Sequence, residues 1–281
     1  MSLSINGSST ANSYQIQKRS NDLAQSLAKL SSGSKLNSAA DGPAALIISQ
    51  KMLAQLSGMQ QSSDDLEQSV NMLQTADGGL SGVQELLQQQ RNLALQASST
   101  ATTDPSQLAA LDVQFQNLGK AINQIAGNTQ YAGAKLLDGS FQNKSVQTGS
   151  ESGQSVNLSI ASQATGSPAG FDQNGLGTNG LSLLAPGGAT AALASIDNAL
   201  KDVGQQRGTL GSLEANTIGS ALGSLKESII SLASSKSTIA DADMAQESAK
   251  MVRNQILVQS SIAASVQQNQ QAGYVMKLLG G

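Results

Sequence analysis

The chain has 281 residues and a formal net charge of −3, with 12% charged and only 2% aromatic residues. It contains no Cys and no His, which excludes thiolate nucleophiles, imidazole bases, disulfides and the usual zinc ligands. No run of Lys or Arg is long enough to neutralise a row of phosphates, so neither nucleic acid nor an anionic membrane surface is an expected partner.

The first residues give no sign of a cleaved leader. Residues 1–11 are polar and lack the basic and apolar regions of a secretory signal peptide. No window holds the roughly 20 apolar residues that a membrane span needs. If the chain is exported, we expect a route that does not read a cleaved signal peptide.

A first helix is predicted over residues 10–32, where Ile16, Leu23, Leu27 and Leu30 follow a heptad-like spacing. A connector over 33–43 follows. Gly33 suits the end of the first helix, and Asp41 is a candidate cap two residues ahead of Pro43.

Residues 44–96 predict one long helix with an apolar stripe that recurs about every 3.5 residues. At about 1.5 Å per residue it would extend about 80 Å, which favours a helical rod over a compact globule. The stripe consists of Met52, Leu56, Met59, Leu66, Val70, Leu73, Leu80, Val83 and Leu87, with Ser63 and Asp77 at two further positions.

The middle of the chain predicts a returning helix and then a change of period. Asp104 and Pro105 are a start signal for a helix over 105–126, which we expect to pack back along the long helix. Alternating apolar residues within 129–160 predict a small β-hairpin. Residues 161–190, rich in Gly, Ser and Asn, are interpreted as an exposed loop.

Helical periodicity resumes over 193–232, interrupted by five glycines that weaken an isolated helix. A connector over 233–240 and a last amphipathic helix to Leu279 complete the chain. The predicted fold class is therefore mainly α, a long antiparallel helical rod or coiled-coil bundle with a small β-hairpin region.

Several segments resemble bacterial flagellins, in the same order along the chain. The similarity covers about residues 1–160 and 189–281. The segments are Leu30-Ser31-Ser32-Gly33, Leu36-Asn37-Ser38-Ala39-Ala40-Asp41, Gln90-Arg91-Asn92-Leu93-Ala94-Leu95-Gln96-Ala97, Thr129-Gln130-Tyr131-Ala132-Gly133-Ala134-Lys135-Leu136-Leu137-Asp138-Gly139, Arg207-Gly208-Thr209-Leu210-Gly211, Ile239-Ala240-Asp241-Ala242-Asp243 and Gln255-Ile256-Leu257.

The resemblance implies a domain organisation. Residues 1–43 would form the N-terminal inner-core helix and connector, 44–232 the outer-core rod, and 233–281 the second connector and the C-terminal inner-core helix. Only about thirty residues stand where larger flagellins carry extra outer domains, so we expect a short form without them.

The resemblance also implies a function: a non-enzymatic subunit that polymerises into the extracellular flagellar filament after type III export. Its implied partners are other copies of the chain, an export chaperone, and cap and junction proteins. An innate immune receptor recognises many flagellins, but Gln89, Asn92 and Gln114 stand here in place of residues usually charged in that pattern. Two alternatives stay open: a hook–filament junction protein, and a secreted helical translocator or adhesin.

No residue pattern indicates a catalytic, cofactor or metal site; Asp41, Asp241 and Asp243 are interpreted as caps and surface charge. The expected sites are contacts between subunits. The candidates are Leu23, Leu27, Leu30, Arg91, Leu93, Ile256, Ile262, Val266, Leu278 and Leu279.

Overall fold

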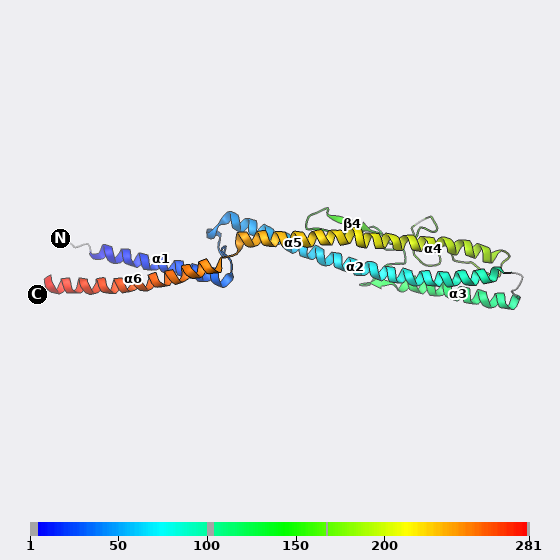
Figure 1. The fold of residues 1–281 in the computed structure, drawn as a ribbon, viewed down its shortest axis with the longest axis horizontal. Coiled ribbons are helices and arrows are strands. Elements are labelled where there is room, and N and C mark those ends of the chain that lie inside the picture. The colour runs from blue at the N-terminus through cyan, green and yellow to red at the C-terminus, as the bar shows by residue number, and fades with distance from the viewer. Residues whose placement is uncertain (1–4, 100–103, 167, 280–281) are drawn as a thin grey trace. The chain divides into compact units, whose positions relative to one another are not determined.

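The computed structural model describes residues 5–99, 104–166 and 168–279, and its elements are almost all helices (Figure 1). The chain divides into two compact units. We call residues 55–230 the central unit, and Met1–Ala54 together with Ser231–Gly281 the terminal unit. The expected boundaries at 43/44 and 232/233 differ from this division, because the first turns of the long helix group with the chain ends. Among the described residues, no helix has a stretch long and apolar enough to cross a bilayer.

The long helix predicted over 44–96 is α2 (Pro43–Ser98), a single helix of 56 residues. In the central unit its buried residues recur with the predicted period of about 3.5. They are Ser62, Ser63, Leu66, Ser69, Leu73, Ala76, Leu80, Val83, Leu87, Gln90, Ala94 and Ala97.

Two helices of the central unit share one core with α2. The returning helix is α3 (Pro105–Asn128), which buries Leu111, Phe115 and Ile122. The other is α4 (Gly188–Ser212), which contributes Ile196 and Val203 to the same cluster. Asp104 is the N-cap residue of α3 and Pro105 its first residue, as predicted, but the Asp104 carboxylate makes no cap hydrogen bond and instead accepts a bond from the Ser106 hydroxyl (2.7 Å).

The helix predicted over 193–232 is divided by a π-helical turn, Leu213–Ile218, into α4 and α5 (Gly219–Ala240). Polar links join α2 to this helical run within the central unit. The guanidinium of Arg207 donates to both carboxylate oxygens of Asp77 (2.7 and 3.1 Å), and Lys226 pairs with Glu67 (2.9 Å). The pKa of Arg207 is raised, first because of its hydrogen bond to Asp77.

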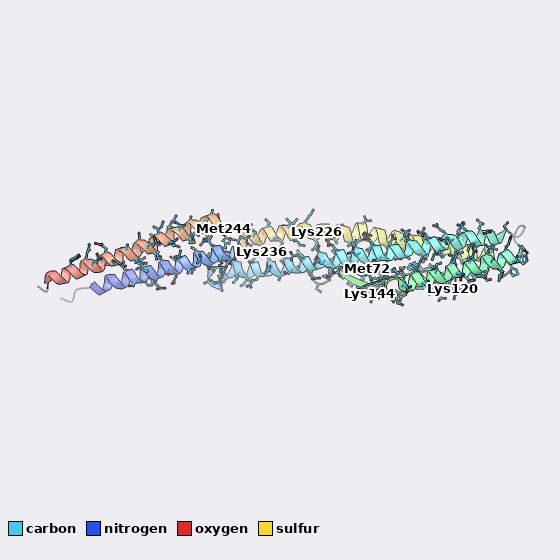
Figure 2. The ribbon with its side chains drawn as sticks, turned by 90° about the horizontal axis from the view of Figure 1, so that it is seen from below. Met72, Lys120, Lys144, Lys226, Lys236 and Met244 are labelled. Carbon is cyan, nitrogen blue, oxygen red and sulfur yellow. The ribbon has the colours of Figure 1, made fainter. Side chains whose placement is uncertain are left out.

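The β region holds two short antiparallel hairpins where one was predicted. β1 (Gln130–Tyr131) pairs with β2 (Ala134–Lys135), and β3 (Lys144–Gln147) pairs with β4 (Ser155–Leu158). A shallow groove beside β3 is lined by Met72 of α2 and Lys144, both labelled in Figure 2.

The interpretation of 161–190 as an exposed loop fits only part of that segment. Its backbone is irregular up to Gly187, yet Phe171, Leu176 and Leu183 are buried in the central core. The carboxylate of Asp112 on α3 accepts a hydrogen bond from the Leu183 N–H (2.7 Å). A helix side chain thus supplies the hydrogen-bond partner that a neighbouring strand would supply in a sheet.

In the terminal unit, α1 (Ile5–Ser32) and α6 (Met244–Leu279) lie side by side and antiparallel (Figure 1). The amide of Asn12 donates to the amide oxygen of Gln268 at one end of the pair (2.5 Å). At the other end, the N–H of Ala242 donates to the carbonyl oxygen of Gly33 (2.9 Å). Gly33 ends α1 with a positive φ of 69°, as predicted for a helix C-terminus.

The connectors of the terminal unit differ from the prediction. Residues 233–240 belong to α5, so the break before α6 covers only 241–243. Ser34 and Asp241 form an isolated antiparallel bridge, and the Lys35 N–H donates to the carbonyl oxygen of Ala240 (2.8 Å). This bridge fastens the two connectors to each other.

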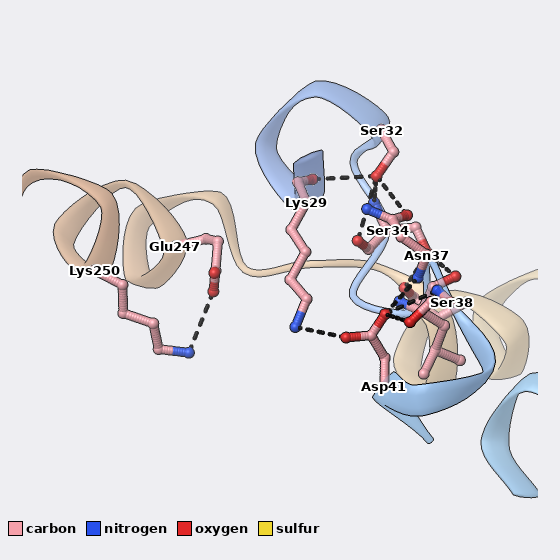
Figure 3. A network of polar contacts seen from close by, with 10 residues as sticks. Lys29, Ser32, Ser34, Asn37, Ser38, Asp41, Glu247 and Lys250 are labelled. Carbon is pink, nitrogen blue, oxygen red and sulfur yellow. Dashed lines mark hydrogen bonds and ion pairs between the residues drawn. The ribbon is translucent and has the colours of Figure 1, made fainter. Parts of the chain in front are cut away.

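Asp41 lies in a 3-10 turn (Ala39–Asp41) and does not cap α2 as expected. Its carboxylate accepts bonds from the N–H and hydroxyl of Ser38 (2.8 and 2.9 Å) and pairs with Lys29 (3.3 Å), as Figure 3 shows. The Ser38 hydroxyl, foremost, holds the pKa of Asp41 below its usual range. The carboxylate therefore ties the connector to the last turn of α1.

Candidate assembly surface

The terminal unit has almost no hydrophobic core of its own. Among its described residues, Ala240 is the single buried hydrophobic one, whereas all the members of the large core cluster lie in the central unit. The large hydrophobic side chains that are exposed show the opposite distribution. Those of the terminal unit are Tyr14, Leu27, Ile47, Ile48, Leu53, Met244, Val252, Ile256, Ile262, Val266 and Tyr274. Those of the central unit are Leu95, Val113, Leu184 and Ile230.

The contact between α1 and α6 is partly polar. The less exposed residues of α1 recur every three or four residues, as a seam toward α6 requires, and include Ile16, Leu23 and Leu30. Polar residues interrupt the seam: Ser26 is buried, and so is Glu247, which pairs with Lys250 (3.2 Å, Figure 3). Such a seam stabilises two paired helices less than an apolar one does, because each buried polar group loses its hydration.

A second apolar stripe follows another face of α6. Val252, Ile256 and Val266 are about half exposed, at 48%, 57% and 52%. They lie on the side of the helix roughly opposite the less exposed residues Asn254, Leu257 and Ser261. A shallow depression lies here, lined by Ser248, Ala249, Val252, Arg253, Ile256 and Leu257. Helix α6 therefore presents small and apolar side chains on two faces, of which α1 covers one.

The structure divides eight of the ten predicted contact residues into three groups. Leu23 and Leu30 are half-buried in the α1–α6 pair, where they contribute to the seam within one chain. Four residues are exposed in the terminal unit: Leu27, Ile256, Ile262 and Val266. The side chains of Leu278 and Leu279 lie outside the described ones.

Arg91 and Leu93 form the third group, and both belong to the central unit. The guanidinium of Arg91 pairs with Asp197 of α4 (2.7 Å), and this hydrogen bond raises the pKa of Arg91. Leu93 is partly buried against the central core. Both side chains thus already have partners within their own unit.

Three exposed residues at the start of α2 were missed by the sequence analysis: Ile47, Ile48 and Leu53. None of them lies on the 3.5-residue stripe, which continues backward from Met52. They could have been identified from the sequence as large apolar residues that lie off the apolar stripe of an amphipathic helix.

Comparison with known protein families decides what this architecture is. Residues 3–142 match the family model of the bacterial flagellin N-terminal helical region, and residues 193–279 match that of the bacterial flagellin C-terminal helical region. The chain belongs to the bacterial flagellin family. A flagellin of Halalkalibacterium halodurans is 34% identical over 258 residues, and the alignment covers 91% of each chain. A flagellin of Bacillus subtilis is 31% identical over 286 residues, covering 91% of this chain and 92% of the relative.

A third relative, the flagellar filament 30.7 kDa core protein of Treponema maltophilum, is 31% identical over 267 residues. The alignment covers 92% of this chain and 93% of that one, as expected for a short form of the flagellin. A solved structure described as a flagellar hook-associated protein of Vibrio parahaemolyticus shares the fold over 72% of this chain and all of that one. Its TM-score is 0.60 and its identity 15%, so this likeness concerns the fold alone. The chain is a structural subunit of the flagellar filament, and the junction and adhesin alternatives are not favoured.

Proposed function

We propose that the terminal unit is the surface through which copies of this flagellin contact one another. The observation that carries the proposal is the distribution of apolar side chains, which are exposed in the terminal unit and buried in the central one. Burial at about 25 cal/mol per Å² between neighbouring copies would offset the cost of ordering the paired helices. Contacts of this kind that do not close into a ring generate an open helical polymer.

Within this proposal, Ile256, Ile262 and Val266 of α6, with Leu27 of α1, contact neighbouring copies. Leu23 and Leu30 act indirectly, by holding α1 against α6. Leu278 and Leu279, in the last turn of α6, are included in the proposal as further contact residues. Arg91 and Leu93 are the weaker candidates, because Asp197 and the central core already hold them.

Two valines with nearly equal exposure test the proposal. Val266 of α6 is 52% exposed and Val113 of α3 is 59% exposed. Threonine has nearly the shape of valine but replaces one methyl group with a hydroxyl. Val266→Thr should cost about 1 kcal/mol per subunit contact and raise the critical concentration for polymerisation about fivefold.

Seeded polymerisation of purified protein, measured by sedimentation and electron microscopy, provides the readout. Val113→Thr is the matched control and should polymerise like the unchanged protein. An unchanged critical concentration for Val266→Thr, with normal helix content, would contradict the assignment of this stripe to contacts between copies.

We also propose the layering that the family suggests. Helices α1 and α6 form the inner layer of the filament, 33–43 and the break 241–243 connect the layers, and 44–240 form the outer layer. The grouping of both chain ends in one compact unit supports this arrangement. A helical reconstruction of the polymer tests it, since it would place α1 and α6 at a smaller radius than α3 and α4.

Family membership further supports export through the flagellar type III apparatus without a cleaved signal peptide. It supports contacts with an export chaperone and with cap and junction proteins, and a purely structural role without catalysis. The export route is tested by measuring secretion of this chain from bacterial hosts with and without the flagellar type III apparatus. Recognition by an innate immune receptor is not part of the proposal, because Gln89, Asn92 and Gln114 depart from the family's charged pattern.

A further inference from the structure

Residues 171–180 of the central unit contain two Asn-Gly pairs, Asn174-Gly175 and Asn179-Gly180. Asparagine can lose its side-chain amide when the backbone nitrogen of the next residue attacks the side-chain carbon. Glycine permits this attack best, because it has no Cβ to hinder the approach and its backbone adopts more conformations. Both pairs therefore have the same intrinsic chemistry, and the fold must decide between them.

In the folded chain, a hydrogen bond and close packing restrain the first pair, Asn174-Gly175. The N–H of Gly175, the attacking group, donates to the carboxylate of Asp172 (2.9 Å). Gly175 is also buried, and a Cβ placed on it would lie 1.9 Å from the carbonyl oxygen of Gly170. The nitrogen of Gly175 cannot reach the side chain of Asn174 unless this packing opens first.

The second pair is open to solvent. Asn179 and Gly180 are both exposed, and no atom lies within 4 Å of the position that a Cβ on Gly180 would take. Gly180 has a φ of 73°, which glycine adopts without strain. Among the described residues, nothing accepts a hydrogen bond from the Gly180 N–H.

We propose that Asn179 is a site of spontaneous deamidation in the folded protein, and that Asn174 is protected from it. A bond forms between the Gly180 nitrogen and Cγ of Asn179 while the bond from Cγ to Nδ2 breaks. Nδ2 leaves as ammonia with the proton that the Gly180 nitrogen gives up. Water then opens the cyclic imide at either carbonyl, producing aspartate or isoaspartate without any transfer of electrons.

The modification changes the contacts of the loop. The side-chain N–H of Asn179 donates to the amide oxygen of Asn174 (2.7 Å). After deamidation an anionic carboxylate, which has no proton to donate, faces that oxygen. The hydrogen bond is lost, and the central unit gains one negative charge. The inference is independent of the assembly surface, since it concerns only the monomer's central unit.

The test incubates the folded monomer at mildly alkaline pH and follows both sites by peptide mass spectrometry with separation of isoaspartate. The expected product at residue 179 is heavier by the difference between a hydroxyl and an amino group. It should form roughly tenfold faster, or more, than at residue 174, whose reaction must first break the bond to Asp172.

Incubation in denaturant is the control for sequence effects, and the two rates should then become similar. Asp172→Ala should accelerate the reaction at Asn174 alone, and Asn179→Gln should abolish it at 179. Circular dichroism establishes that each variant is folded. Equal rates in the folded protein, or faster reaction at Asn174, would overturn the proposal, as would a folded protein that reacts at neither site.

Discussion

At the scale of single residues, two adjacent glycines of α2 have opposite environments. A Cβ placed on Gly79 would lie 2.7 Å from both Cδ1 of Leu137 and Oγ1 of Thr129. A Cβ on Gly78 would have no atom within 4 Å. The β1–β2 hairpin region thus approaches α2 closely at one position and not at its neighbour.

We therefore expect opposite effects from the same substitution. Gly78→Ala should stabilise the chain by up to about 1 kcal/mol, because alanine is the better helix former. Gly79→Ala should destabilise it by about 1–3 kcal/mol, because the new methyl group must displace Leu137 and Thr129. Urea unfolding of both variants measures this difference. Each variant serves as the control for the other. A change in the free energy of unfolding with the same sign in both variants would contradict the close packing described at Gly79.

The carboxylate of Asp41 gives a prediction about pH. Its pKa is lowered in the folded chain, chiefly by the Ser38 hydroxyl. A lowered pKa means that the carboxylate stabilises the connector above the pKa it has in the unfolded chain. This stabilisation is lost as the pH falls through the folded value. Ser38→Ala should raise the pKa of Asp41 toward the ordinary value. The stability of the connector should then change less as the pH is lowered.

Carbon NMR of the labelled carboxyl groups in the monomer measures that change. Asp138 provides the control, because the hydroxyl of Ser140 lowers its pKa in the same way. Ser140→Ala should raise the pKa of Asp138 and leave that of Asp41 unchanged. If Ser38→Ala leaves the Asp41 titration where it was, the hydroxyl is not its main partner.

At the scale of elements, the π-helical turn accounts for an irregular spacing in the sequence. The buried residues Ile196, Val203 and Leu210 follow a seven-residue step, and so do Ile218 and Leu225. Between Leu210 and Ile218 the step is eight. A π-helical turn accommodates one extra residue, so both halves of the helical run keep their buried side facing the core.

Removal of that residue gives a direct test. Deletion of the exposed Ala215 restores a step of seven, so a continuous α-helix should form with a melting temperature equal to or above that of the full chain. Deletion of the exposed Gln205 in α4 is the control. It moves Leu210 out of the seam, with an expected loss of about 2 kcal/mol. Equal destabilisation by both deletions would show that the turn has another role.

The same elements show what periodicity can and cannot predict. The stripe of α2 was predictable because its apolar side chains repeat over many turns toward one core. The π-helical turn was not, because the eight-residue step appears only once the structure shows which apolar residues of this glycine-rich stretch are buried. Phe171, Leu176 and Leu183 were missed because each is an isolated apolar residue in irregular backbone, where no period indicates burial. Among the ten predicted contact residues, sequence alone could not separate Leu23, covered by its own chain, from Ile256, which is exposed.

At the scale of the whole molecule, both chain ends contribute to one weakly packed unit. Deletion of residues 241–281 should therefore leave a soluble monomer that does not polymerise. The helix signal in circular dichroism should fall by more than the deleted residues account for, because α1 loses its partner. The central unit, with its separate core, should retain its own unfolding transition.

Sedimentation and electron microscopy after seeding measure the outcome, and deletion of residues 1–32 is the complementary control. Filaments formed by the chain without 241–281 would show that α6 is dispensable for assembly. Full retention of the α1 helix signal in that chain would show that α1 does not depend on α6.

The pairing of α1 with α6 has a consequence for how faulty copies are handled. Because α6 is synthesised long after α1, a product that terminates before α6 leaves α1 without its partner helix. A fragment that ends between residue 230 and α6 still contains the residues of the central core and can fold there, yet it lacks the α6 stripe proposed to contact a neighbour. Under the proposed assembly, growth of the fibre would thus select for chains that have been translated through α6.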